Sequence, residues 1–322
     1  MPLTSHLKDK QSPVRQFITE SFPELALAGS QGAEGKAAAA RFALDDIVAL
    51  PTVVPIPVSV ETAGRRRHAV VAGQALDYLV RMSLPDFELE QTAAWVGLDM
   101  LRPWPNSHAS RVHAHEMLRG VYAMAEQTMQ EPNPAPDDLA RAAVILGWCE
   151  SIYRAGRLMF MVSSTGVLIT RSQSPEELWA AVDENLLADL RQMMVPVTPV
   201  ITGWADEIAA GARYEPNPMF EGSRAVGGAD ADLAVGDLLV EVKTREQVTR
   251  PWLREALLQL VGYVLLDLGD EHRIRRVGML LPRQAHMQTW TVSDLLGDDA
   301  DHSLPRLRQR FRGTLDEVDL FS

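Results

Sequence analysis

The spacing of apolar and polar residues divides the chain into a long helical part and a shorter mixed part. Apolar positions of residues 1–50 are typical of helices, and a proline-broken extended stretch follows at 52–61. A helix is predicted over 70–83, and apolar residues then recur at intervals of three and four through 86–196. From about residue 199 the pattern instead predicts a short helix, a loop at 214–220, a hairpin at 228–244, a helix at 251–268, strands at 276–281 and 289–292, and a helix at 304–318.

This order of elements predicts an α/β protein in which a mixed sheet is interrupted in sequence by a large helical insertion. Three segments are expected. Residues 1–85 form an N-terminal region that includes a first core helix at 70–83. Residues 86–198 form a helical insertion or helical domain, and residues 199–322 form the sheet-containing core.

The hairpin at 228–244 carries the most informative local pattern. Two apolar-rich runs flank Gly236-Asp237, and glycine supplies the positive φ that the first position of a two-residue turn requires. A turn at these two residues places Asp232 opposite Glu241, with three apolar pairs between them and the turn. Asp230 is an alternative first acid, but it lies farther along the strand from Glu241, so Asp232 is favoured.

The period-2 alternation of a strand separates the hairpin side chains into two faces. One face is wholly apolar and is expected to lie in the core: Leu233, Val235, Leu238, Val240 and Val242. The other face carries Asp232, Glu241 and Lys243. Opposed carboxylates repel each other, and a divalent cation with oxygen ligands would compensate their charge. The pattern therefore indicates a metal-dependent phosphodiesterase site.

Composition and charge narrow the class of protein. The 322-residue chain has a net charge of −12, which argues against a protein that coats nucleic acid through bulk electrostatics but allows a local basic cleft. Its apolar runs are shorter than the roughly 18–20 residues that span a bilayer, and its N-terminus lacks an apolar secretory segment. Cys149 is the only cysteine. These features predict a cytoplasmic protein without membrane contact.

The helix expected after the hairpin carries a second polar pair. Gln259 and Tyr263 are four residues apart, so they lie on one face, at the edge of the apolar stripe of the helix. The core stripe is Leu253, Leu257, Leu260, Val261, Val264 and Leu268. Because this helix is expected to pack beside the hairpin, the pair is predicted to approach Glu241 and Lys243.

Asp232…Glu241-Val242-Lys243 on a hairpin, followed by helical Gln259-x-x-x-Tyr263, resembles the PD-(D/E)XK nuclease superfamily and its RecB-type exonuclease branch. The resemblance covers about residues 219–281, and Ala231 stands where the signature has proline. It implies a restriction-endonuclease-like mixed sheet core flanked by helices, with a large all-helical N-terminal or inserted region. It also implies catalytic roles for the five signature residues.

The resemblance implies further ligands and contacts. Asp232 and Glu241 would bind Mg²⁺ or Mn²⁺, with the backbone carbonyl of Val242 as an additional ligand. Asp77, four residues after Gly73 on the predicted helix 70–83, matches the position of an acid or histidine in the RecB-type branch. Its alternative is an exposed helix residue or a partner of Arg81. Arg250 and Arg254, which follow the site strand, are expected to contact phosphates.

The sequence thus predicts a metal-dependent nuclease that hydrolyses phosphodiester bonds in DNA, in DNA processing or phage defence. The alternative is a nuclease-fold module without strong activity that binds nucleic acid or a partner. The helical segment 86–198 would then provide the surface for a protein partner or a second copy of the chain. An intact set of Asp232, Glu241 and Lys243 favours the enzyme, because a decayed site is expected to lose one of them.

Overall fold

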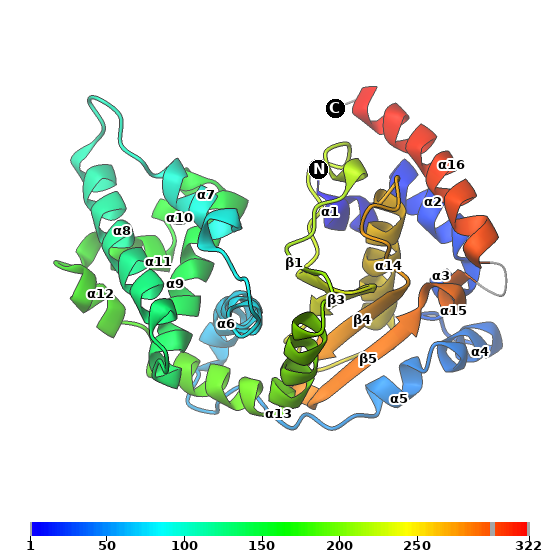
Figure 1. Ribbon diagram of the computed structural model, residues 1–322, viewed down its shortest axis with the longest axis horizontal. Coiled ribbons are helices and arrows are strands. Elements are labelled where there is room, and N and C mark those ends of the chain that lie inside the picture. Colours follow the sequence, from blue (N-terminus) through cyan, green and yellow to red (C-terminus); the bar gives the residue numbers. More distant parts are fainter. Residues whose placement is uncertain (1, 297–299, 321–322) are drawn as a thin grey trace. The chain divides into compact units, whose positions relative to one another are not determined.

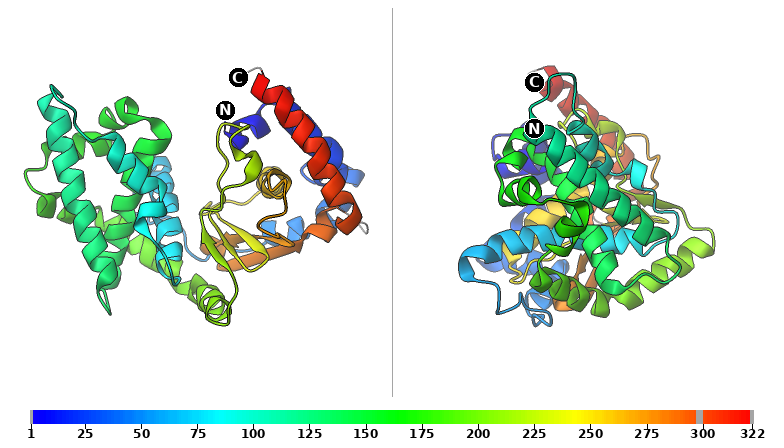
Figure 2. Two further views of the ribbon diagram at one scale, coloured as in Figure 1. Left: turned by 45° about the horizontal axis from the view of Figure 1, so that its top comes forward. Right: turned by 90° about the vertical axis from the view of Figure 1, so that its left-hand side faces the viewer.

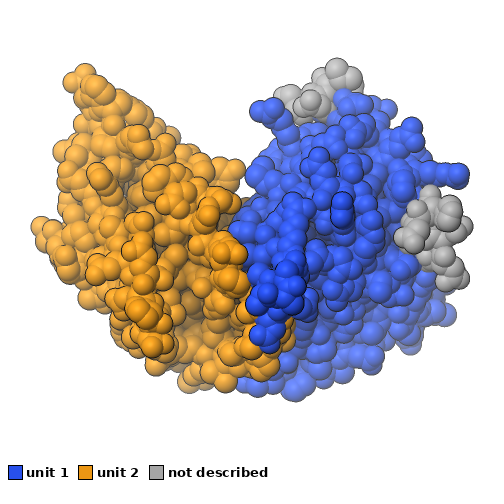
Figure 3. Space-filling model, in the orientation of Figure 1, with its two compact units in different colours: residues 1–53, 206–322 blue, residues 54–205 orange. Residues whose placement is uncertain are grey.

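The computed structural model describes residues 2–296 and 300–320, which form two compact units (Figure 1, Figure 3). Unit 1 joins Met1–Val53 to Asp206–Ser322, and unit 2 is the intervening Val54–Ala205. The described residues form a mixed α/β protein that is mostly helical, as the sequence predicted. The division differs from the three consecutive segments expected, because residues 1–53 pack with the C-terminal part of the chain.

Unit 1 is built on a five-stranded mixed sheet in the order β1-β2-β3-β4-β5. Its strands are β1 (Tyr214–Pro216), β2 (Leu233–Val235), β3 (Leu238–Val242), β4 (Arg276–Leu281) and β5 (His286–Thr291). Strands β3 and β4 are parallel, and the other neighbours are antiparallel. A parallel pair needs a crossover, which helix α14 (Arg250–Leu266) provides. The predicted order of hairpin, helix and strand is therefore confirmed.

The helices of unit 1 pack around α14. Figure 2 (left) shows α14, in gold, along its axis between the sheet and the red C-terminal helix. Leu257, Leu260 and Val264 are buried with residues of α1, α2 and α16 in one apolar cluster. The helices are α1 (Leu3–Lys8), α2 (Pro13–Ser21), α3 (Pro23–Leu27), α4 (Ala33–Arg41), α5 (Leu44–Val48), α15 (Val292–Leu296) and α16 (Ala300–Leu320), with 3-10 turns η2 (Glu221–Ser223) and η3 (Pro282–Gln284).

Both faces of the central strands are buried, which extends the prediction made from the hairpin pattern. The predicted apolar face is buried at all five positions. The opposite face is also core: Ala234 and Leu239 belong to the same apolar cluster as α14, together with Met279 of β4. Because Glu241 pairs with Met279 in the sheet, it lies on the face that α14 covers. A carboxylate on this face is surrounded by apolar groups.

Two predicted boundaries were wrong. Residues 214–216, expected in a loop, form strand β1, where Tyr214 pairs with Val235 and Pro216 with Leu233. Proline has no backbone N–H to donate to a neighbouring strand, and an edge strand tolerates this lack. The two prolines of residues 214–220 made the strand hard to recognise in the sequence. The change of character expected near 199 lies inside helix α13 (Glu184–Ala209), which continues through Pro196 and Pro199.

Unit 2 consists of helices. They are α6 (Thr62–Met82), α7 (Ala93–Met100), α8 (Ala109–Gln130), α9 (Pro136–Ala155), α10 (Arg157–Met161), α11 (Ser164–Arg171), α12 (Pro175–Ala180) and most of α13, with a 3-10 turn η1 (Leu89–Gln91). Helix α9 lies at its centre, and Gly97 of α7 allows close packing, because a Cβ there would lie 1.8 Å from the carbonyl oxygen of Cys149. The predicted helix 70–83 is α6 and belongs to this unit.

Among the described residues, the longest apolar stretches of helix fall short of what a bilayer crossing requires.

Candidate functional site

The hairpin has the register predicted from its turn. Leu233 pairs with Val240, Ala234 with Leu239, and Val235 with Leu238. Gly236 has φ of 60°, in the left-handed region that glycine adopts without steric cost.

Asp232, directly before β2, is held across the hairpin by a backbone contact. The N–H of Val242 donates a 2.6 Å hydrogen bond to its Oδ2. The carboxylate is therefore fixed beside the end of β3, where Glu241 lies.

Glu241 and Lys243 extend from the same face of β3. Glu241 is 2% exposed, and its Oε2 forms an ion pair with the ammonium of Lys243. The Lys243 N–H donates to the Leu280 carbonyl at 2.9 Å, which continues the parallel pairing one residue past the strand. The Lys243 side chain retains 24% exposure, so its charged end reaches the surface beside a buried carboxylate.

Gln259 and Tyr263 of α14 form a polar cluster of four side chains with Glu241 and Lys243. Lys243 Nζ donates to Gln259 Oε1 at 3.4 Å, and Gln259 Nε2 donates to the Tyr263 hydroxyl at 2.6 Å. The nearby Tyr263 hydroxyl lowers the pKa of the Glu241 carboxyl, against the larger raising effect of burial. The structure thus joins both polar residues of the helix to the charged pair of the hairpin. Tyr263, predicted at the edge of the core, is 3% exposed.

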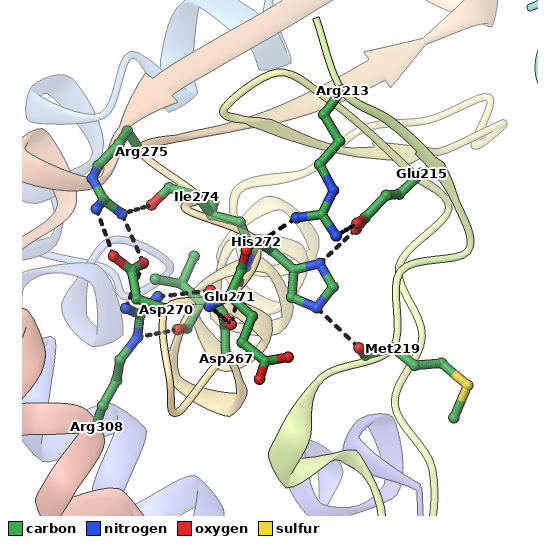
Figure 4. Close-up of polar contacts among 11 residues, drawn as sticks. Arg213, Glu215, Met219, Asp267, Asp270, Glu271, His272, Ile274, Arg275 and Arg308 are labelled. Atoms are coloured by element: carbon green, nitrogen blue, oxygen red, sulfur yellow. Dashed lines mark hydrogen bonds and ion pairs between the residues drawn. The ribbon is translucent and has the colours of Figure 1, made fainter.

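Tyr263 is held in place by an aromatic partner from the loop before Asp232. The Phe220 ring stacks on Tyr263 with a centroid distance of 5.4 Å, and it also contacts the ring of His272 at a centroid distance of 5.1 Å. His272 Nδ1 lies 2.5 Å from Glu215 Oε2, and its Nε2 lies 3.0 Å from the Met219 carbonyl oxygen; both contacts are drawn in Figure 4. Strand β1 and the loop that leads to the site are therefore anchored to the end of α14.

A buried ion pair fixes the same end of α14 from the other side. Arg308 of α16, 4% exposed, lies 3.2 Å from Asp267 Oδ2 and 2.7 Å from Asp270 Oδ1 (Figure 4). Burial raises the pKa of Asp267. Arg275 also binds Asp270 and, against the opposing effect of burial, lowers its pKa to about 2. The helix that carries Gln259 and Tyr263 is thus fastened at its C-terminal end.

Burial controls the ionisation of the site. Desolvation, together with repulsion from Asp232, raises the pKa of Glu241 to about 7, although Lys243 opposes the shift. Burial, with repulsion from Glu241, also raises the pKa of Tyr263, so its hydroxyl stays neutral and can donate. Negative charge is therefore in excess around Glu241, and Lys243 offsets only part of it.

Asp232 and Glu241 offer carboxylate oxygens, the type of ligand that Mg²⁺ and Mn²⁺ take. Within 2–296 and 300–320, no group of three or more His, Cys, Asp and Glu side chains is arranged to hold a metal. Mg²⁺, however, is usually held by one or two carboxylates and completes its shell with waters and substrate phosphates. Asp232 and Glu241 supply two carboxylates, and the raised pKa of Glu241 marks a place where a cation would be stabilised.

The remaining predicted residues have different surroundings. Asp77 lies in unit 2 and forms an ion pair with Arg81, whereas the polar cluster of site residues is contained in unit 1. Arg250 forms an ion pair with Asp45 of α5. Arg254 instead lines a pocket of about 540 Å³ that Lys243 and Gln259 also line.

This pocket includes residues that the sequence analysis missed. Lys8, Lys10 and Arg15 come from the N-terminal segment, and Trp252 comes from the first turn of α14. The sequence did contain a signal for Lys8 and Lys10, because the chain has only four lysines and two of them lie close together at positions 8 and 10. Their placement beside Lys243 depends on the packing of α1 and α2 against α14.

Comparison of the chain with protein-family models, with curated proteins and with solved structures finds no match.

The raised pKa of Glu241 predicts a pH-dependent stability in the absence of metal. Its folded pKa of about 7 exceeds the ordinary glutamate pKa of 4.5, so its contribution to stability is complete below pH 4.5 and is lost as the pH rises through 7. Glu241→Gln should remove this loss, on the order of 2 kcal/mol between pH 5 and 8.

Hydrogen exchange of β3 amides in EDTA, measured at both pH values, checks this prediction. An exposed glutamate of α4 provides the control variant, Glu34→Gln, which should keep the wild-type pH dependence. If Glu241→Gln loses as much stability between pH 5 and 8 as the wild type does, Glu241 does not titrate in this range.

Proposed function

We propose that this protein is a metal-dependent nuclease that hydrolyses phosphodiester bonds in DNA, with a restriction-endonuclease-like core in unit 1. The observation that carries the proposal is the polar cluster in which Glu241, Lys243, Gln259 and Tyr263 are linked in succession, with Asp232 fixed beside it. Two segments of the chain, each carrying part of a nuclease-like signature, converge on one buried carboxylate.

Each residue has a role that its contacts support. Asp232 and Glu241 would hold Mg²⁺ or Mn²⁺, and the carbonyl of Val242 is the proposed third protein ligand. When bound, the ion polarises the phosphodiester and lowers the pKa of the attacking water. Lys243 presents a positive charge next to these carboxylates, where it would stabilise negative charge that develops on the phosphoryl group.

Gln259 and Tyr263 would position the charged residues. Gln259 binds Lys243 through its carbonyl oxygen and Tyr263 through its amide, so it fixes the direction of the ammonium. Tyr263 accepts a hydrogen bond from Gln259 and is itself held by Phe220. Since all these residues lie in unit 1, the proposed chemistry requires no side chain from unit 2.

A polyanionic substrate is supported by the charge around Lys243. The pocket beside it has five basic residues, although the chain as a whole carries a net charge of −12. A basic cleft on an acidic protein concentrates a phosphate-bearing substrate locally. DNA is the substrate that combines this charge with a hydrolysable phosphodiester.

Metal-dependent cleavage of labelled DNA tests the proposed function. Single-stranded and duplex DNA, with RNA for comparison, would be incubated with the full chain in EDTA, Mg²⁺ or Mn²⁺. Cleavage is expected with either ion and should disappear in EDTA and in Glu241→Ala. Glu34→Ala, an exposed substitution on α4, should retain full activity. Metal-independent cleavage, or equal cleavage by Glu241→Ala, would refute the proposal.

A further inference from the structure

The pocket beside Lys243 lies between the N-terminal helices and the first turns of α14. Lys8 is the last residue of α1, Lys10 follows it, and Arg15 belongs to α2. Arg254 and Trp252 line it from α14. Lys243 and Gln259 also line the pocket, so it borders two residues of the polar cluster. A molecule bound in it would lie directly beside the proposed reaction centre.

The lysines of the chain are concentrated at this pocket. The chain contains four lysines: Lys8, Lys10, Lys36 and Lys243. Three of them line this one pocket, and the fourth lies exposed on α4. With two arginines, the described residues that line the pocket include five basic side chains and a single acidic one, Glu255. The pocket is therefore strongly positive on a protein that is acidic overall.

Glu255 organises the arginines of the pocket. Its Oε2 accepts from Arg15 at 2.9 Å and its Oε1 accepts from Arg15 at 3.1 Å, and Oε1 also binds Arg254. One carboxylate thus holds two guanidinium groups, which leaves the cluster with a net positive charge. Burial opposes ionisation of Glu255, but the hydrogen bonds from both arginines lower its pKa below the ordinary value.

An aromatic side chain completes the lining. The half-buried Trp252 borders the pocket, and the Arg245 guanidinium lies 5.6 Å from the centroid of its ring. A basic groove with an aromatic platform is the arrangement by which proteins bind single-stranded nucleic acid, because phosphates contact the cations while a base stacks on the ring. A compact anion such as free phosphate would use the cations and leave the indole without a function.

The size of the pocket favours an unpaired strand over a duplex. Its volume is about 540 Å³. Pockets of roughly 300–1,000 Å³ enclose small organic molecules, so this one accommodates a nucleotide or two with the base inside. A base in a duplex is stacked and paired, and it would have to leave the helix to reach Trp252, at a cost of a few kcal/mol.

We infer that this pocket binds an unpaired nucleic-acid segment, with phosphates on Lys8, Lys10 and Arg15 and a base on Trp252. This inference rests on the proposed function, because it identifies single-stranded DNA as the form that reaches Lys243. Lys8 and Lys10 are phosphate-binding residues, and Trp252 is the stacking residue.

The scarcity of lysine makes a site-resolved binding experiment possible. Reductive methylation with ¹³C-formaldehyde labels the four lysines of the full chain, in addition to its amino terminus. Titration with a ten-nucleotide thymidine oligonucleotide in EDTA should shift the signals of Lys8, Lys10 and Lys243. The Lys36 signal should not move, which provides an internal control. Single Lys→Arg variants assign the four signals.

Two further titrations identify the ligand. A blunt-ended duplex of the same length should bind at least about tenfold more weakly. Inorganic phosphate at the same phosphate concentration should shift the three signals much less, because it lacks the base that stacks on Trp252. Equal binding of the duplex, equal shifts with inorganic phosphate, or a shift of Lys36 as large as that of Lys8 would each overturn the inference.

Exposed substitutions test the same pocket without loss of folding. The double variant Lys8→Glu, Lys10→Glu should weaken oligonucleotide binding by about tenfold or more at moderate salt, whereas Lys36→Glu should not. Because binding is measured without metal, it is independent of cleavage. If the oligonucleotide binds in the pocket but no nucleic acid is cleaved, the nuclease function is refuted and the inferred binding site is supported. If DNA is cleaved but the lysine signals do not respond, the nuclease function is supported and the inferred binding site is refuted.

Discussion

Replacement of Lys243 by alanine is expected to reduce DNA cleavage by at least about 10²–10³-fold, the effect of removing one preorganised group that stabilises transition-state charge. Lys243 is the lysine in contact with Glu241, and its side chain is partly exposed beside the basic pocket. Because it extends beyond the end of β3 and is not part of the apolar core, its loss should leave the fold intact.

Single-turnover cleavage with Mg²⁺ at pH 8 measures this effect, and circular dichroism checks the fold. The pH matters because Lys243 lowers the pKa of Glu241, so its removal makes the carboxyl easier to protonate. Lys36→Ala, on the exposed face of α4, is the matched control and should cleave like the wild type. Lys243→Ala activity within tenfold of the wild type would exclude the role proposed for this residue.

Replacement of Arg308 by alanine is expected to destabilise unit 1 by about 3–5 kcal/mol, the usual cost of breaking a buried ion pair from one side. Arg308 Nε donates to the Val264 carbonyl at 3.0 Å, and its guanidinium pairs with Asp267, which is 1% exposed. Without the arginine, Asp267 retains backbone hydrogen bonds from Glu271 and His272 but loses its buried counter-charge. The end of α14 should then open more readily.

Hydrogen exchange of α14 amides reports on this unit alone and gives the free energy of opening. Arg306→Ala, an exposed substitution on the same helix, should change it by less than about 0.5 kcal/mol. The double variant Arg308→Met, Asp267→Asn should regain most of the loss, because both charges are gone. Equal protection in Arg308→Ala and the wild type would mean that α16 does not stabilise α14.

The hairpin shows how far local pattern determines structure. Gly236-Asp237 specified the turn, the turn specified the register, and the register placed Asp232 beside Glu241. Every step depends on neighbours in sequence and on the alternation of side chains along a strand. The pairing of Gln259 with Tyr263 follows from helical spacing in the same way.

Other features depended on contacts between distant segments. Strand β1 contains Pro216 and has little strand character of its own, and it forms because β2 offers an open edge. Helix α13 continues through Pro196 and Pro199, where local preference predicted a boundary. The N-terminal segment joins unit 1 across an interval of 152 residues, Val54–Ala205, which no local pattern indicates.

By itself, the sequence determined the hairpin, its register and the spacing that places Gln259 and Tyr263 on one helix face, because these follow from backbone geometry over a few residues. Only the tertiary structure decided that α14 covers the site face of the sheet, which buries Glu241 and raises its pKa. It also decided that Lys8, Lys10 and Arg15 lie beside Lys243. Both outcomes arise from apolar packing between elements far apart in the chain, and such packing depends on the shapes of complete surfaces rather than on local spacing.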